Sequence, residues 1–460
     1  MRRLSTLPRG TKRLYGICLH LAVGASIWGY NIGILSSVLV HPGWREALDD
    51  PTPAQIGLVT GVYYLGTLLS FTLLSHPLAD YLGRRRAAVI GTCALCLGAM
   101  CMAAANGSAA VGIMALGRWI CGVGVGVVST AVPLYQSEVS PAKERGRLNQ
   151  NRPRWLLEKG DGDTASQVLH YLREEAMPAE AITHELHAIS ADVESRRKAG
   201  TTFVSLSLSL FRDASLFARL WRAFLLQFMA QMCGATAIKY YLPTLLKALG
   251  LEYRLALMAG AAEMTVKIAM TIVEMWAIDR FGRRACMTGG SLIMGVAMLV
   301  NGLLPIMYPG NENKVADIIC IAFIFIYAMG YSLGLGPAAW VYSTEIFPTS
   351  VRARGLNFAA SGGSIGSILV SQIWPVGNAK FGSGIYFFFM VVNFICVPVI
   401  WLLYPETKGR ELEDMDSLFG KSEERNATLS LGGVAEDVGE DGGDMLSTTA
   451  THEEDEPLLP

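Results

Sequence analysis

The hexapeptide "DRFGRR", residues 279–284, lies between two long apolar runs, and a close copy, "DYLGRR", occupies residues 80–85. Each copy is followed by a second motif in which tyrosine, glutamate, proline and arginine keep the same spacing. These residues are Tyr135, Glu138, Pro141 and Arg145 in the first half, and Tyr342, Glu345, Pro348 and Arg352 in the second. Two motifs that recur in the same order indicate a chain built from two repeats.

The composition is that of a membrane protein. Of the 460 residues 52% are hydrophobic and 17% are charged, against about 25% charged in a soluble domain. The apolar residues form ten runs, each near or above the ~20 residues that span a bilayer as a helix, at 14–40, 55–78, 86–105, 110–135, 220–248, 255–278, 285–308, 316–342, 355–377 and 384–404. Because a backbone in lipid must satisfy its own hydrogen bonds, we predict an all-α polytopic membrane protein.

Charges in the loops predict the orientation of these spans. The first 13 residues carry five basic side chains and no acid, and the positive-inside bias places them in the cytoplasm. Counting spans then places "KERGR" (143–147), "VRARG" (351–355) and both hexapeptides on the same side. We therefore expect cytoplasmic N and C termini. We expect the plasma membrane as the location, with a vacuolar or endosomal membrane as the alternative.

Charged residues of the repeated motifs all fall at predicted cytoplasmic helix ends. Such charges can link helices and hold the inner face shut until the two halves move, and the simpler reading is that they only anchor helix ends. Transporters are often built from repeats of this kind, with the substrate near the membrane midplane. The predicted cytoplasmic gate comprises Asp80, Gly83, Arg84, Arg85, Glu138, Arg145, Asp279, Gly282, Arg283, Arg284, Glu345 and Arg352.

The two repeats differ in length. After Glu345 the chain makes two more spans before "PETKGRELEDM" (405–415), and after Glu138 it makes none. An even number of missing spans leaves every later segment on its own side of the membrane. The predicted domains are a basic N-tail (1–13), a four-span half (14–149), a polar helical linker (150–218), a six-span half (219–406) and an acidic tail (407–460).

Several motifs together resemble the sugar porter family of the major facilitator superfamily, in its fungal type. They are "VPLYQSEVSPAKERGR" (132–147), "PRWLLEKG" (153–160), "GPAAWVYSTEIFPTSVRARG" (336–355), "PETKGRELEDM" and the two hexapeptides. The resemblance implies two six-helix halves joined by a cytoplasmic linker, and transport of monosaccharides or polyols by alternating access.

The resemblance also implies that the fifth and sixth helices are absent here, with the junction between Leu148 and Arg152. In the family the fifth helix lines the central cavity and packs against the eighth. Without both helices, faces that should meet protein would meet lipid, and we expect this at Gly122, Gly124, Gly126 and Ser129. The same glycine run, "GVGVG" (122–126), otherwise indicates close helix packing. We predict a chain that inserts but does not transport.

Matching positions imply the substrate pathway. Asn31 stands where proton-coupled members carry aspartate, and an amide cannot titrate, so a facilitative carrier is favoured. Arg118 matches the family arginine expected to contact Asn31 or the Glu138 region. Gln231, Tyr240, Tyr241 and Trp340 match sugar-contacting positions, while Ala230, Thr236, Gly363 and Ser364 depart from the family pattern.

Four ionisable residues lie inside predicted spans: Lys239, Glu263, Lys267 and Glu274. Such residues are costly in a membrane and face a cavity or one another. Glu263 and Lys267 are four residues apart and can pair on one helix face. Two readings of Lys267 stay open, internal pairing and contact with an anionic substrate such as a carboxylated polyol.

We expect a carrier for a monosaccharide, a polyol or a related small polar solute. A transport-dead splice or gene-model variant, or a regulatory sensor of the same family, is the alternative. No nucleophile–base set, metal cluster, cofactor motif or nucleic-acid motif is evident, so we expect no enzyme, cofactor or nucleic-acid partner. Near the C-terminus, Glu454 precedes Leu458 and Leu459 in a pattern that resembles an acidic dileucine signal for a sorting adaptor.

Overall fold

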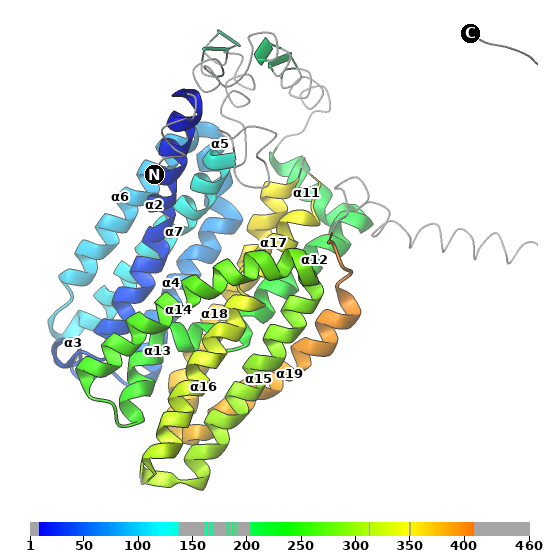
Figure 1. The fold of residues 1–460 in the computed structure, drawn as a ribbon. Coiled ribbons are helices and arrows are strands. Elements are labelled where there is room, and N and C mark those ends of the chain that lie inside the picture. The colour runs from blue at the N-terminus through cyan, green and yellow to red at the C-terminus, as the bar shows by residue number, and fades with distance from the viewer. Residues whose placement is uncertain are drawn as a thin grey trace, which may run out of the picture.

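The computed structural model describes residues 9–137, 203–311, 313–348 and 351–408, with isolated residues between 162 and 190. Glu138, Arg145, most of the predicted linker and the predicted sorting motif at Glu454, Leu458 and Leu459 lie outside the described residues. In the described ranges all regular structure is helical, which confirms the all-α prediction (Figure 1).

The first half contains a long N-terminal helix and three further membrane-length runs. Its elements are α2 (Arg9–Val38), α3 (Pro42–Ala47), α4 (Pro53–Leu69), the π-helical turn η1 (Ser70–Leu74), α5 (Ser75–Leu82), α6 (Arg84–Ala103), η2 (Gly107–Ala109) and α7 (Ala110–Ser137). Helix α4 begins with a capping box, because Thr52 and Gln55 each accept from the other's backbone amide.

The second half contains six such runs, two of them interrupted. Its elements are α11 (Phe203–Arg212), α12 (Ala214–Met232), α13 (Ala235–Ala248), α14 (Tyr253–Phe281), α15 (Arg283–Met307), η4 (Pro309–Asn311), α16 (Lys314–Leu333), α17 (Pro337–Glu345), α18 (Arg352–Phe381), η5 (Gly382–Gly384) and α19 (Ile385–Leu403). Each of the ten apolar runs predicted from the sequence falls on one helix or on consecutive helices.

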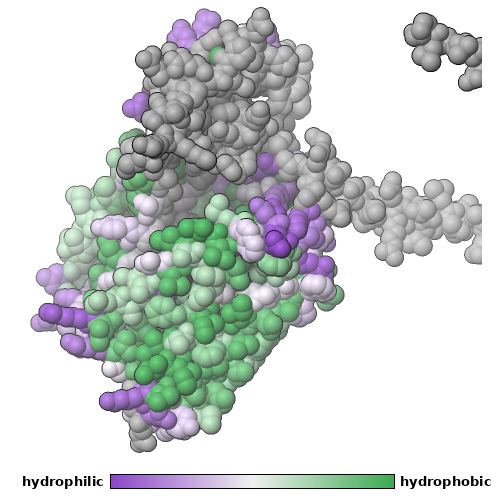
Figure 2. Space-filling model, in the orientation of Figure 1, coloured by the Kyte–Doolittle hydropathy of each residue, from purple (hydrophilic) through white to green (hydrophobic). Residues whose placement is uncertain are grey.

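Among the described residues, seven helical segments are long and apolar enough to cross a membrane, and the last of them, 352–403, comprises α18 and α19. Hydrophobic residues cover the side of the helical part, and hydrophilic residues gather near its ends (Figure 2). The distribution is that of a membrane-embedded bundle.

Small residues bring the helices of the first half into close contact. A Cβ at Gly122 would collide with the Tyr63 carbonyl on α4, and one at Gly124 would lie 2.5 Å from the Gly91 carbonyl on α6. Gly126 packs on Ser70 of η1. The expectation that these glycines would meet lipid is therefore wrong, because α4 and α6 already cover them; Ser129, on the same helix, is half-buried.

Helix α14 is less buried than the other described membrane-length segments. Only 11% of the residues in its most apolar stretch are buried, against 56% in the runs 53–82 and 110–132. Its exposed side chains are large and apolar: Met258, Ile268, Ile272, Met275 and Trp276. The sequence reasoning placed the uncovered surface on α7, and the structure places it on α14.

Candidate functional site

The two halves meet directly along α4 and α18. On this seam the Tyr241 hydroxyl of α13 lies 3.0 Å from Thr60 Oγ1. The Thr67 hydroxyl lies 3.0 Å from Ser364 Oγ. A Cβ at Gly57 would lie 2.9 Å from the Ser371 carbonyl, so the backbones themselves are close.

A buried arginine organises the middle of the seam. Arg118 of α7 is 1% exposed, and its Nη1 donates to Asn31 Oδ1 at 2.6 Å while its Nη2 donates to Tyr240 Oη at 3.2 Å. The guanidinium also lies 4.4 Å from the centre of the Tyr63 ring. The structure thus brings together Asn31, Arg118 and Tyr240, which the sequence singled out, and adds Tyr63, which it did not.

The remaining pathway residues surround this centre from the second half. Gln231 accepts from Thr236 Oγ1 at 3.0 Å, and Thr236 Oγ1 also lies 3.1 Å from Ser367 Oγ. The threonine that departs from the family pattern therefore occupies a polar place beside Gln231. Trp340 lies half-buried on α17, directly after the break between α16 and α17.

The four intramembrane charges lie on α13 and α14. Lys267 pairs with Glu263, and Glu263 is fully buried. The Lys239 ammonium lies 5.1 Å from the centre of the Tyr331 ring and interacts electrostatically with Glu263. Glu274 is 2% exposed and interacts with the backbone of Ala338 on α17.

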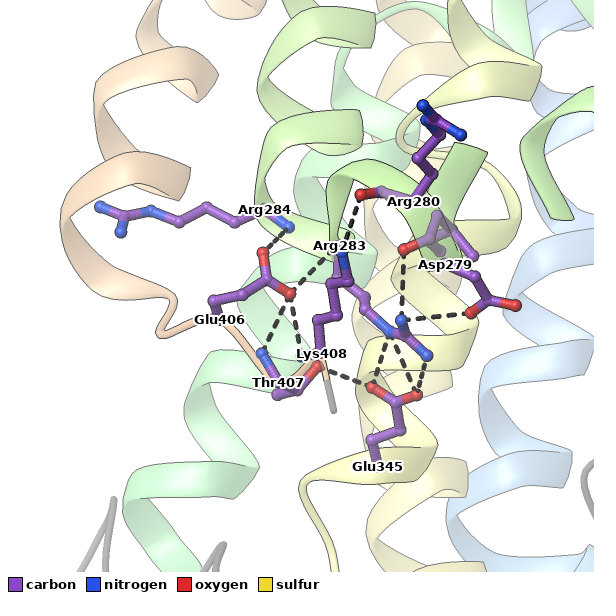
Figure 3. A network of polar contacts seen from close by, with 9 residues as sticks. Asp279, Arg280, Arg283, Arg284, Glu345, Glu406, Thr407 and Lys408 are labelled. Atoms are coloured by element: carbon purple, nitrogen blue, oxygen red, sulfur yellow. Dashed lines mark hydrogen bonds and ion pairs between the residues drawn. The ribbon is translucent and has the colours of Figure 1, made fainter. Parts of the chain in front are cut away.

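The end of the second half that holds the "DRFGRR" motif carries a polar network (Figure 3). Arg283 donates to Glu345 from Nη2 at 2.7 Å and from Nε at 3.2 Å, and its Nη1 lies 3.4 Å from Asp279. Gly282 starts α15 at φ +93°, and a Cβ there would lie 2.6 Å from a Glu406 oxygen. The predicted gate residues Asp279, Gly282, Arg283 and Glu345 therefore lie in one cluster.

Sequence reasoning missed the contribution of "PETKG" to this cluster. Glu406 accepts from the backbone amides of Arg283 and Arg284, both at 2.9 Å, and so caps α15. Thr407 donates to Glu345 at 2.6 Å. The glutamate and threonine directly after the last span could have indicated this contact. The free backbone amides at a helix N-terminus attract acidic groups, and a glycine at the cap position supplies no side chain of its own to bind them.

The other predicted gate residues are placed differently. Arg284 stacks on Trp401 and donates to its carbonyl, and Arg352 Nε donates to the Phe347 carbonyl at 3.2 Å. In the first half Gly83 starts α6 at φ +86° and Arg84 pairs with Asp80 at 3.2 Å, which repeats the geometry around Gly282. Arg85 is exposed.

Comparison with known proteins gives the family. The profile described as "Sugar (and other) transporter" matches residues 17–152 and 150–419, so its two matching pieces meet at 150–152. Sugar transport protein 10 of Arabidopsis thaliana is 26% identical over 471 aligned positions that include 86% of this chain and 89% of that protein. The MFS-type transporter qa-x of Neurospora crassa is 26% identical over 496 positions, with 91% of each chain covered.

Solved structures share the fold. The proton:xylose symporter XylE of the major facilitator superfamily, bound to 6-bromo-6-deoxy-D-glucose, superposes with a TM-score of 0.70 at 20% identity, covering 89% of this chain and 100% of that chain. A partially occluded inward-open form of XylE from E. coli gives a TM-score of 0.68 at 18% identity, covering 86% and 99%. The chain therefore belongs to the sugar (and other) transporter family, whose members are membrane transporters and not enzymes.

Proposed function

We propose that this fold is a facilitative carrier for a sugar, a polyol or a related small polar solute, working by alternating access, and that the chain as it stands does not complete transport. The single observation that supports the lack of transport is the exposure of α14. A helix with three charged residues inside its membrane span is normally covered by protein, because such residues are costly in lipid. Here it is the least buried of the seven membrane-length segments found among the described residues.

The comparisons support a missing pair of helices at the expected place. The family profile breaks at 150–152, within the predicted junction. In the match to the Arabidopsis protein, 86% of 460 residues is about 396, so about 75 of the 471 aligned positions are gaps in this chain. That length suffices for two spans of ~20 residues and their loops. The same features support the alternative of a transport-dead splice or gene-model variant.

The facilitative mode rests on Asn31. Its amide accepts from Arg118 at 2.6 Å, and this contact needs no proton. A carboxylate at this place would change charge during the cycle, and an amide cannot. We also propose that both termini lie in the cytoplasm and that the protein resides in the plasma membrane, with an internal membrane as the alternative. The predicted domain limits and the sorting motif at Glu454, Leu458 and Leu459 are part of this proposal.

The substrate is a small polar solute. The relatives include sugar transport proteins and a probable quinate permease of Aspergillus terreus, 26% identical over 478 positions. Their names span neutral sugars and a carboxylated cyclic polyol, so the choice between these classes depends on the side chains at the site.

The test compares two proteins in cells that lack their own carriers. One is this chain, and the other carries the fifth and sixth helices of the qa-x transporter between Leu148 and Arg152. We expect both to reach the membrane and only the restored protein to show saturable uptake from a panel of sugars and polyols. Saturable, competable uptake by the short chain would refute the inactivity, and no uptake by a well-expressed restored protein would refute the carrier.

A further inference from the structure

Lys239, Glu263 and Lys267 form a group in which the charges do not balance; Glu274 lies eleven residues after Glu263, on the same helix. Lys267 pairs with Glu263, which accounts for one lysine. Among the described residues Lys239 makes no ion pair or hydrogen bond; its ammonium lies near the Tyr331 ring and interacts electrostatically with Glu263, Cys233 and Tyr240. Two ammonium groups therefore share one carboxylate, and the group of three carries a net charge of +1 inside the membrane.

The three members of the group differ in exposure. Glu263 is fully buried, whereas Lys239 is half-buried and the Lys267 side chain is 16% exposed. The two lysines are therefore more accessible than the carboxylate. An uncompensated cation in a membrane is costly unless a counter-charge is supplied.

Hydrogen-bonding groups of the substrate pathway adjoin these cations. Tyr331 of α16 lies against Lys239, and its hydroxyl interacts with the side chain of Gln231 on α12. Lys239 also directly precedes Tyr240, which contacts Arg118 at the seam. A solute held by Gln231 through hydroxyl groups would bring a further substituent close to Lys239.

We propose that Lys239 and Lys267 form a carboxylate-binding subsite, so that the preferred solute is a polyol bearing one carboxylate and not a neutral sugar. This inference rests on the proposed carrier function and names its substrate class. Glu263 holds Lys267 in place, and the solute carboxylate completes the charge balance through Lys239. All the residues involved come from α12 to α16, which this chain contains.

The experiment measures binding to the purified full chain in lipid nanodiscs. The probes are quinate, a cyclic polyol with one carboxylate, and its methyl ester, which has nearly the same shape without the charge. We expect quinate to bind at least about tenfold more tightly than the ester, as the loss of a charged hydrogen bond implies. Equal affinity for the two probes would overturn the proposal.

Three variants test whether the charge of Lys239 causes the preference for quinate over its ester. Lys239→Met leaves the Glu263–Lys267 pair intact and should remove the preference for quinate while ester binding stays unchanged. Glu263→Gln removes the competing carboxylate and should bind quinate at least as tightly as the parent. Lys247→Met, an exposed lysine on the same helix, is the matched control and should change nothing. A quinate preference that survives Lys239→Met would refute the assignment.

Uptake by the protein with restored helices distinguishes failure of the carboxylate subsite from failure of the proposed carrier function. Saturable uptake of neutral hexoses, unaffected by quinate and by Lys239→Met, would leave the carrier standing and the subsite refuted. Failure to take up any solute of either class would refute the carrier and, with it, the inference. Quinate uptake that is lost in Lys239→Met would support both.

Discussion

At the scale of single residues, the contact between Asn31 and Arg118 determines how the buried guanidinium is satisfied. Arg118 is 1% exposed, and its Nε has no partner among the described residues. Its stability in the bundle therefore depends on the two acceptors that it does have, Asn31 and Tyr240. Loss of either acceptor leaves a desolvated charge.

Asn31→Leu should destabilise the folded chain by roughly 1–3 kcal/mol, because the Arg118 donor at 2.6 Å would lose its acceptor. Asn31→Asp should restore stability, since a carboxylate accepts the same hydrogen bond. The measurement is thermal unfolding in detergent, followed by size-exclusion chromatography. Equal melting temperatures for the leucine variant and the parent would show that the contact is not stabilising.

The Asn31→Asp change also tests coupling in the protein with restored helices. The parent should take up solute at the same rate with and without a protonophore, because Asn31 has no titratable proton. Asn31→Asp, facing Arg118, should make uptake sensitive to the protonophore. Collapse of parental uptake on addition of the protonophore would contradict the facilitative mode.

Trp340 is the aromatic residue assigned to the substrate. In the restored protein, Trp340→Ala should weaken solute binding by roughly 1–3 kcal/mol through loss of a stacking face. Phe381→Ala, at an exposed aromatic residue at the end of α18, serves as the control for expression and folding. Unchanged affinity in Trp340→Ala with normal surface expression would remove this residue from the site.

At the scale of elements, the start of α15 depends on a residue far along the chain. Gly282 at φ +93° offers no side-chain cap, and Glu406 supplies one from beyond α19 by accepting from two backbone amides. The same carboxylate adjoins the Arg283–Glu345 pair through Thr407 (Figure 3). This arrangement fastens α15, α17 and the segment after α19 to one another at one end of the bundle.

Glu406→Ala should lower the stability of the second half by about 1–2 kcal/mol, the usual cost of losing a cap. Glu252→Ala is the matched control, because Glu252 occupies the cap position of α14 without a side-chain hydrogen bond. Hydrogen exchange at the first turn of α15 reads out the effect locally. Protection that is unchanged in Glu406→Ala would mean that the cap seen here does not stabilise α15.

At the scale of the whole molecule, the exposed surface of α14 is where a fifth helix would pack according to our proposal. A spin label at Ile272, which is 65% exposed, should be accessible to oxygen dissolved in lipid in this chain. In the protein with restored helices it should become protected, because the fifth helix would cover it. A label at Val296 of α15 should stay accessible in both proteins. Equal accessibility at Ile272 in both would show that the inserted helices do not pack on α14.

Sequence by itself determined the helices, the repeat and the family, because these depend on local composition and on spacing along the chain. Ten apolar runs give ten helical stretches, and the paired hexapeptides give two matching helix starts at Gly83 and Gly282. The pairing of Glu263 with Lys267 could also be predicted from the sequence, since residues four apart share a helix face. These features need no knowledge of which helices are neighbours.

Only the tertiary structure decided which surfaces are covered and which charges are matched. Gly122, Gly124 and Gly126 pack on α4 and α6, and the uncovered face belongs to α14, because neighbours are set by how the helices cross and not by composition. Glu406 reaches α15 across more than a hundred residues of chain. Lys239 interacts electrostatically with Glu263 from a different helix, so the net charge of the group appears only when the two helices are packed together.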